Sequence, residues 1–215
     1  MAGRFALAAV AGQATFMVSW IIAGRLEPRY SAEEEAVSAL AAGTAEHPWI
    51  VTAGVLAWAV GTACCAEALR RGVRLRRLRR LPVALLWIAA AGMVALALAP
   101  LDCSPVGGSQ CLRLQRAGEL SSRHYAHELI AGIPQITVGT SPFALWLSLR
   151  PGRGARAALA SGIAGLLLTW WVGTALELNP GDRGAGQRIL LGAFVLWLCA
   201  VAVTAWRQSR PSSRG

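Results

Sequence analysis

Residues 82–101 read PVALLWIAAAGMVALALAPL and carry no charged side chain anywhere along their length. The run is as long as the ~20 residues that an α-helix needs to cross a hydrocarbon core ~30 Å thick. Inside a bilayer every backbone polar group must find its partner within the protein, and an apolar segment of this length does so only as a helix. The stretch therefore predicts a transmembrane helix and an integral membrane protein.

Five further stretches have the same apolar character: 5–23, 48–66, 125–149, 157–178 and 189–206. We therefore expect an all-α fold, a bundle of six transmembrane helices. A chain of 215 residues leaves no soluble segment long enough to build a second core. The prediction is a single transmembrane domain over residues 1–206, followed by a short basic tail at 207–215.

The arginines are distributed unevenly between the two sides that these spans define. All 21 basic residues are arginine, and fourteen of them fall on alternate connections: Arg4, Arg70, Arg71, Arg74, Arg76, Arg77, Arg79, Arg80, Arg150, Arg153, Arg156, Arg207, Arg210 and Arg214. Short basic connections stay in the cytoplasm because arginine resists translocation. We therefore predict a multi-pass protein of the cell (plasma) membrane with both termini in the cytoplasm.

The net charge of +10 could also suggest a nucleic-acid partner, but an arginine run between two spans has a simpler interpretation. It anchors the topology and contacts anionic headgroups, so membrane lipids are the expected partners and nucleic acid is not expected. Small residues four apart, such as Ala57 and Gly61 or Ser161 and Gly165, allow close helix packing within the bundle, between copies in a homo-oligomer, or against an unknown membrane partner.

The first span has a second interpretation. Arg4 followed by an apolar run up to Ala23 resembles a secretory signal peptide, although the run is longer than is typical of one. We expect a retained first helix. Cleavage after Ala23 would instead leave five spans and place the N-terminus outside.

The first outer loop, residues 24–47, contains the signals of a short helix. Ser31 can cap its start with Glu34 at the capping-box position, and Gly43 can end it. We expect this helix to lie on the outer surface, with Leu40 toward the bundle and with Glu34 and Glu35 in water.

The second outer loop holds Cys103 and Cys111, with turn-forming residues between them. Outside the cytoplasm such a pair can oxidise. A possible disulfide here closes a small loop, contributes roughly 2–3 kcal/mol at best and shapes the loop over the bundle. Two free thiols are the alternative.

The fourth span opens with SRHYAHELIAGIPQ at residues 122–135. On a helix, His124, His127, Glu128 and Gln135 share one face. Polar side chains at membrane depth usually face the bundle interior, so this stripe indicates a functional site. Anchoring at the headgroup level is the alternative, since the stripe starts near the outer end of the span.

Asp102 ends the third span at the height of the two histidines. Imidazole and carboxylate groups are ligands that zinc accepts, so Asp102, His124 and His127 are candidate metal ligands. Glu128 could then serve as the general base for a zinc-bound water. The His-x-x-His spacing does not by itself identify a zinc site.

Several short motifs resemble a known family. PRYS at 28–31, AVSALAAG at 36–43, LDC at 101–103 and the two histidines opening the fourth span are similar to the bacterial and archaeal membrane proteins of domain of unknown function 998 (DUF998). The resemblance covers roughly residues 7–200 and implies a six-helix membrane protein without an assigned activity. It marks Ser38, Asp102, His124 and His127 as the matching positions.

Three functions stay open. The first, which asks only for what the sequence shows, is a small-molecule or lipid binding or structural membrane protein with a polar site at the outer face. The second is a zinc-dependent hydrolase of lipids or headgroups, analogous to ceramidases and adiponectin receptors, with Ser38 and Glu128 as candidate catalytic residues. The third is a small transporter, although the spans have almost no ionisable residues near their centres. We predict the first, and no enzymatic activity is assigned.

Overall fold

The computed structural model describes residues 2–28, 30–76, 78, 80–104, 109–178 and 182–209. Over these residues the chain forms helices and connections, without strands. In chain order the elements are α1 (Ala2–Leu26), the 3₁₀ helix η1 (Val37–Ala41), α2 (Pro48–Gly72), α3 (Arg80–Leu98), α4 (Ser109–Ala117), α5 (Ser122–Ser148), α6 (Arg153–Leu178) and α7 (Arg183–Ser209). The all-α prediction is confirmed.

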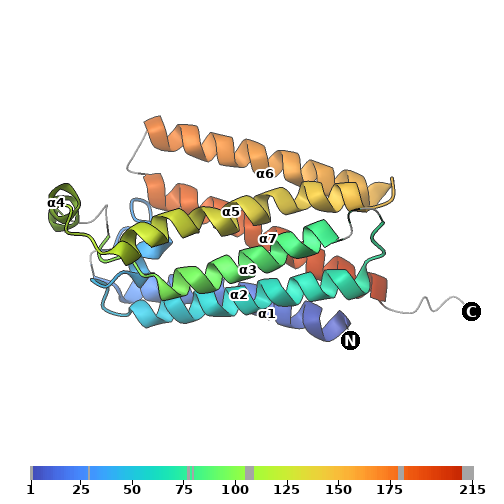
Figure 1. Cartoon of the computed structure of the whole chain (residues 1–215), viewed down its shortest axis with the longest axis horizontal. Helices are drawn as coiled ribbons and strands as arrows, with labels where there is room; N and C mark the ends of the chain where they lie inside the picture. The colour runs from blue at the N-terminus through green and yellow to red at the C-terminus, as the bar shows by residue number, and fades with distance from the viewer. Residues whose placement is uncertain are drawn as a thin grey trace, which may run out of the picture.

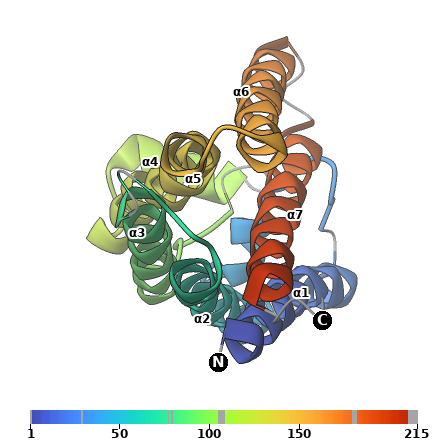
Figure 2. The ribbon, with the colours of Figure 1, turned by 90° about the vertical axis from the view of Figure 1, so that its right-hand side faces the viewer.

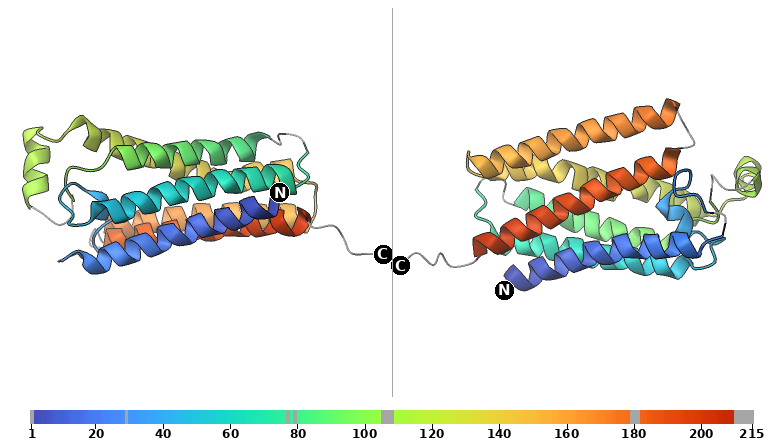
Figure 3. Two further views of the ribbon diagram at one scale, coloured as in Figure 1. Left: turned by 90° about the horizontal axis from the view of Figure 1, so that it is seen from below. Right: turned by 180° about the vertical axis from the view of Figure 1, so that it is seen from behind.

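The six long helices run roughly along one axis (Figure 1). Seen end-on, α3, α2, α1 and α7 follow one another in an arc, and α6 projects at the edge beside α5 and α7 (Figure 2). The start of α1 and the end of α7 lie at the same end, which we call the terminal end; η1 and α4 lie at the opposite end, the loop end (Figure 3). An even number of long helices between the two chain ends produces this arrangement.

Local sequence explains where several helices begin and end. Pro48 lies in the first turn of α2, where its missing N–H has no helical partner to lose. Ser121 caps α5, because its Oγ accepts the N–H of His124. Gly118 follows α4 with φ of 68°, a left-handed conformation that glycine adopts without strain. These signals fix the start of α2, the end of α4 and the start of α5.

The core begins with the pairing of α1 and α2. A Cβ placed on Gly12 would lie 2.5 Å from the carbonyl oxygen of Ala57, and the Cα of Gly12 lies beside Gly61. One turn further along, the rings of Phe16 and Trp58 stack 4.3 Å apart. The Ala57–Gly61 spacing therefore serves packing within the bundle. Cleavage of the first helix would remove Gly12 and Phe16 from this core.

Five helices among the described residues are long and apolar enough to cross a membrane: α1, α2, α3, residues 153–172 of α6, and α7. The chain is therefore a polytopic helical membrane protein. The expected sixth span, 125–149, lies in α5, which is not among the five, so the count of six is not confirmed. The reason is composition: α5 is 27 residues long, but its first two turns hold Arg123, His124, His127 and Glu128.

One boundary also differs from the sequence prediction. Helix α7 continues to Ser209, so the first three residues of the predicted tail are helical, because Trp206 still belongs to the apolar run. Residues 210–215 lie outside the described part of the chain, as do Arg77 and Arg79 of the arginine run and residues 105–108 of the cysteine loop.

The short helix in the first loop is η1, which is 3₁₀ rather than α-helical and begins later than expected. Ser31 Oγ does accept the N–H of Glu34, at 3.3 Å. The helix does not continue because Arg188 takes the carbonyls of Ala32 and Glu35 at 2.6 and 2.9 Å. Leu40 is buried as expected, but Glu35 is also buried, at 8% exposure, so the expectation that it stays in water is wrong.

Candidate ligand-binding cavity at the loop end

A cavity of about 480 Å³ lies at the loop end between α1, α2, α3, α5, α7 and η1. Most of its wall is apolar, with Phe16, Val55, Leu96 and Leu191 among the lining side chains. The polar side chains that line it come from four elements, η1, α2, α5 and α7: Ser38, Thr52, Trp58, His127, Glu128, Gln135 and Gln187. An apolar cavity with a few convergent polar groups is the usual form of a small-molecule site. We call this space the loop-end cavity.

The first loop lies over this cavity and is held to α7. Val37 N–H donates to Gln187 Oε1 at 2.6 Å, so the amide NH₂ of Gln187 is the group left for the cavity. Arg188 contacts Tyr30 by a hydrogen bond to its hydroxyl, and its guanidinium lies 5.4 Å from the centre of the Trp20 ring. Ser38 of η1 lines the cavity from this side. The loop is therefore a lid fixed by side chains of α7.

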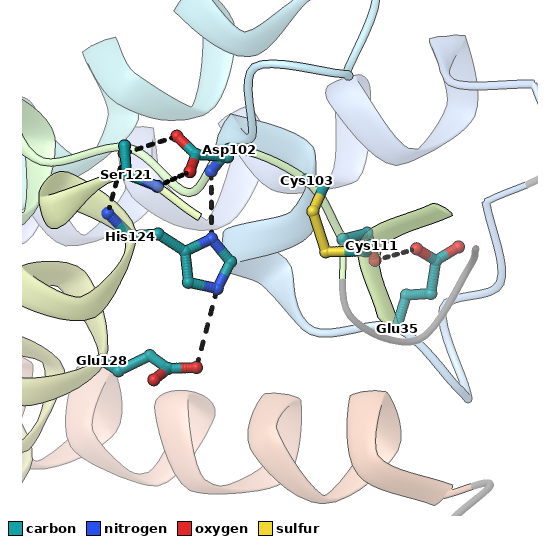
Figure 4. Close-up of a disulfide and its surroundings, with 8 residues drawn as sticks. Glu35, Asp102, Cys103, Cys111, Ser121, His124 and Glu128 are labelled. Atoms are coloured by element: carbon teal, nitrogen blue, oxygen red, sulfur yellow. Dashed lines mark hydrogen bonds and ion pairs between the residues drawn. A yellow bond between two sulfur atoms is a disulfide. The ribbon is translucent and has the colours of Figure 1, made fainter. Parts of the chain in front are cut away.

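Asp102, Ser121 and His124 join the end of α3 to the start of α5 (Figure 4). The carboxylate of Asp102 accepts the N–H of Ser121 at 2.6 Å and its hydroxyl at 2.7 Å. In return, the N–H of Asp102 donates to His124 Nδ1 at 3.2 Å. The two bonds from Ser121, backbone first, hold the pKa of Asp102 below its ordinary value. This cluster positions the first turn of α5.

The two histidines have opposite tautomers. His124 accepts a backbone N–H at Nδ1, so its proton is on Nε2, which faces Glu128 Oε1 at 3.7 Å. His127 Nδ1 lies 2.7 Å from the carbonyl oxygen of Ala99 and must donate to it. In a neutral imidazole that bond leaves Nε2 of His127 without a proton, so Nε2 can accept a hydrogen bond. His127 lines the cavity, whereas the ring of His124 is buried in the cluster with Asp102.

These contacts do not fit the proposed zinc site. A histidine that binds metal donates its other ring N–H to a neighbour, whereas His124 accepts at Nδ1 and carries its proton at Nε2. Both carboxylate oxygens of Asp102 are bonded to Ser121. Among the described residues no group of three His, Cys, Asp or Glu side chains is placed to hold a metal ion. The structure thus pairs Asp102 with His124 but separates His127 from both.

Ser38 and Glu128, the candidate catalytic residues, both line the loop-end cavity. The side chain of Glu128 is 55% exposed and faces the Nε2 proton of His124. In the described part of the chain Ser38 makes no side-chain hydrogen bond, so no base activates its hydroxyl. The pair shares a cavity without the contacts of a nucleophile and its base.

Trp58 adds a polar group that the sequence analysis did not single out. Its side chain is 5% exposed, and its Nε1–H has no hydrogen-bond partner. A buried N–H without a partner costs about 1–3 kcal/mol. Trp58 lines the cavity, but its nitrogen has almost no accessible surface, so a bound acceptor would reach this donor only after a shift of the ring or its neighbours.

Cys103 and Cys111 are joined by a disulfide beside the cavity's lid (Figure 4). The neighbouring Ser104 Oγ donates to Glu35 Oε2 at 2.6 Å. Both cysteines are buried against Leu120, just before α5. The disulfide loop, the first loop and the start of α5 are therefore linked at the loop end. The remaining cysteines, Cys64, Cys65 and Cys199, are free thiols.

The model of the family described as "Protein of unknown function (DUF998)" matches residues 10–204 of the chain. The chain belongs to this family. The resemblance drawn from the short loop motifs is thereby confirmed. Comparisons with curated proteins and with solved structures find no match for it.

In this DUF998 protein the sequence motifs found only part of the site. Asp102 and His124 are neighbours, and Ser38 and His127 line one cavity. Gln187 was missed because it precedes a long apolar run and belongs to no motif. Trp58 was missed among many membrane tryptophans; its signal is helical spacing, since it follows Val51 and Val55 on one face of α2.

Proposed function

We propose that this protein binds one amphiphilic molecule with an uncharged, hydroxyl-bearing head, such as a monoacylglycerol, in the loop-end cavity. The observation that carries the proposal is the unpaired Nε1–H of the buried Trp58 on the wall of an otherwise apolar cavity. A ligand oxygen would give this donor its partner. The apolar wall would take part of the acyl chain.

The polar groups around the cavity support an uncharged head. Trp58 and the NH₂ of Gln187 are donors, and His127 Nε2 is an acceptor, a combination that suits hydroxyl groups. Among the residues that the structure describes, Glu128 is the only charged side chain lining the cavity, and no arginine lines it. An anionic head would meet the Glu128 carboxylate without a balancing cation.

The arginine distribution supports the orientation that goes with this function. Arg74 and Arg76 after α2, Arg150 between α5 and α6, and Arg153 at the start of α6 lie at the terminal end, so that end would face the cytoplasm of a cell with this protein in its plasma membrane. The loop-end cavity would then open toward the outer leaflet. We make no proposal of catalysis, because Ser38, His127 and Glu128 share the cavity without bonding to one another.

Native mass spectrometry of the full chain in detergent, titrated with 1-monoolein, tests this proposal. We expect one monoolein per chain. Ala131→Trp, which fills the cavity from α5, should abolish the adduct. Ile136 lies on the same helix and is 67% exposed, so Ile136→Trp should leave the adduct unchanged. Equal binding by the two tryptophan variants would contradict the proposal.

A second variant separates loss of the site from loss of the fold. Trp58→Phe keeps an aromatic ring beside Phe16 and removes the unpaired N–H together with part of the volume of the indole. We expect monoolein to bind about 3–10-fold more weakly, the value of one hydrogen bond. The unfolding temperature should fall only modestly, because the gap left by the smaller ring is partly offset by removal of a costly unpaired donor.

A further inference from the structure

A second cavity, of about 380 Å³, lies at the terminal end between α2, α5, α6 and α7. Its volume falls in the range of about 300–1,000 Å³ that ligand sites occupy. The deep part of its wall is apolar, with Leu69, Leu145, Ala158 and Val201 lining it. We call it the terminal-end crevice. No residue is shared between its wall and that of the loop-end cavity.

The mouth of this crevice is positively charged. Arg74 reaches it from the connection after α2, and Arg150 reaches it from the connection between α5 and α6. Neither arginine forms an ion pair with a described residue, in contrast to Arg70, which pairs with Glu67 at 2.7 Å. In the described part of the chain, no acidic side chain lines the crevice. Two guanidinium groups from separate connections therefore meet at one opening with their charge uncompensated.

The start of α6 adds to this charge. Gly154 and Ala155, in the first turn of α6, also line the crevice. The first N–H groups of a helix have no helical acceptor, and the helix dipole places partial positive charge there. An anion at this mouth could accept from backbone N–H groups as well as from both arginines.

We propose that the terminal-end crevice binds an anionic phospholipid, with its phosphate at Arg74, Arg150 and the first turn of α6 and an acyl chain along Leu145 and Val201. Charge complementarity selects the phosphate, because one guanidinium group can donate two parallel hydrogen bonds to two oxygens of a phosphate. The apolar depth of the crevice selects a lipid over a free anion, which would leave that wall unfilled. Basic pockets between membrane helices bind phospholipid headgroups in this way.

This site is independent of the function proposed for the loop-end cavity. Trp197 Nε1–H donates to Ser141 Oγ at 2.8 Å, joining α7 to α5 in the segment between the two spaces. Ser141 is buried, at 2% exposure. Binding in the crevice could therefore fail while monoolein binding at the other end persists.

The test compares lipid binding by native mass spectrometry, using phosphatidylglycerol and phosphatidylcholine with the same acyl chains. The full chain should bind phosphatidylglycerol at least about tenfold more tightly, and Arg74→Gln/Arg150→Gln should remove that preference. The matched control is Arg76→Gln/Arg80→Gln, which removes the same charge at the same end from residues that neither line the crevice nor belong to the first turn of α6. The control should keep the preference within about twofold.

Three results would overturn the proposal. The first is equal binding of the two lipids by the unchanged chain, and the second is an equal loss in the two double variants, which would mean that total charge alone attracts the lipid. The third is displacement of phosphatidylglycerol by millimolar inorganic phosphate, which would mean that the mouth binds a free anion. All four substituted arginines lie in exposed positions, so both double variants should fold.

Discussion

The loop-end cavity and the terminal-end crevice share one kind of wall and differ in their mouths. Each is lined by apolar side chains of α2, α5 and α7, and each has the size of a small-molecule site. One mouth carries Glu128 with amide, imidazole and indole groups, and the other carries Arg74 and Arg150. The comparison teaches that the helices supply similar apolar space at both ends, and that the residues at the helix ends decide which headgroup each end can accept.

The strongest way to break this comparison is to combine the two sets of substitutions. In a chain with Ala131→Trp, Arg74→Gln and Arg150→Gln, monoolein binding should fall about a hundredfold, as in Ala131→Trp alone. The tryptophan takes the space that the ligand needs, which should weaken the binding free energy by about 2–3 kcal/mol. The phosphatidylglycerol preference should fall only as far as in the arginine variant. Distant sites without shared partners have additive effects. Native mass spectrometry with both lipids measures the two losses in one sample.

A coupled result would change the interpretation. If the arginine substitutions alone weakened monoolein binding, the two spaces would form one continuous path through the bundle. The matched Arg76→Gln/Arg80→Gln variant shows whether any such coupling is specific to the crevice.

A second prediction sharpens the comparison at the loop end, where Asp102 fixes the start of α5. Asp102→Ala should lower the free energy of unfolding by about 1.5 kcal/mol, because two hydrogen bonds to a carboxylate are lost. Asp102→Asn keeps one acceptor and should lose less. Thermal unfolding in detergent measures both, and phosphatidylglycerol binding at the opposite end should not change. A lipid preference that fell in Asp102→Ala would contradict the separation of the two ends.

The same carboxylate predicts a pH dependence. Because the folded pKa of Asp102 lies below its ordinary value of 3.8, its contribution is fully present above that value. It is lost as the pH falls through the lowered pKa. The difference in unfolding temperature between the unchanged chain and Asp102→Ala should therefore be constant from pH 5 to 7 and shrink below about pH 4. A difference that stayed constant down to pH 3 would exclude a role for the charge.

The smallest loss of stability is expected for the hydrogen bond between Trp197 and Ser141, which lies between the loop-end cavity and the terminal-end crevice. Ser141→Ala removes the acceptor of Trp197 Nε1–H and should cost about 1 kcal/mol, a shift of about 2–4 °C in unfolding temperature. Thr140→Ala is the matched control, since its exposed hydroxyl bonds only to carbonyls of its own helix. A larger loss in Thr140→Ala than in Ser141→Ala would show that the bond to α7 contributes little.

Most of the fold could be predicted from the sequence because apolar runs of membrane length have one stable solution. The exceptions have local causes. Helix α4 lies in a loop whose length and polarity predict nothing definite, and α5 combines a long helix with a polar first third. The first loop was predicted as an α-helix from its own residues, but Arg188, distant in sequence, takes the carbonyls that such a helix needs.

The candidate site was predicted less completely, for a related reason. Helical spacing correctly put His127 and Glu128 on one face, and both line the cavity. It could not show that His124 faces Asp102 while His127 faces the carbonyl of Ala99, because those partners come from the connection after α3. A backbone partner leaves no trace in a sequence motif. Ligand sets inferred from residue types alone therefore overestimated how many side chains converge.

The close approach of α1 to α2 at Gly12 and Gly61 has a mechanical consequence. The helices meet backbone against backbone at these two glycines, and neither glycine carries a side chain that could rotate to let them separate. A Cβ on Gly72 would likewise lie 2.4 Å from the carbonyl oxygen of Ala205, so α7 is held equally firmly to α2. In the part of the chain that the structure describes, helix α6 packs mainly against α5 and α7. Any opening that admits a lipid from the bilayer must therefore come from displacement of α5 and α6 against a rigid three-helix block.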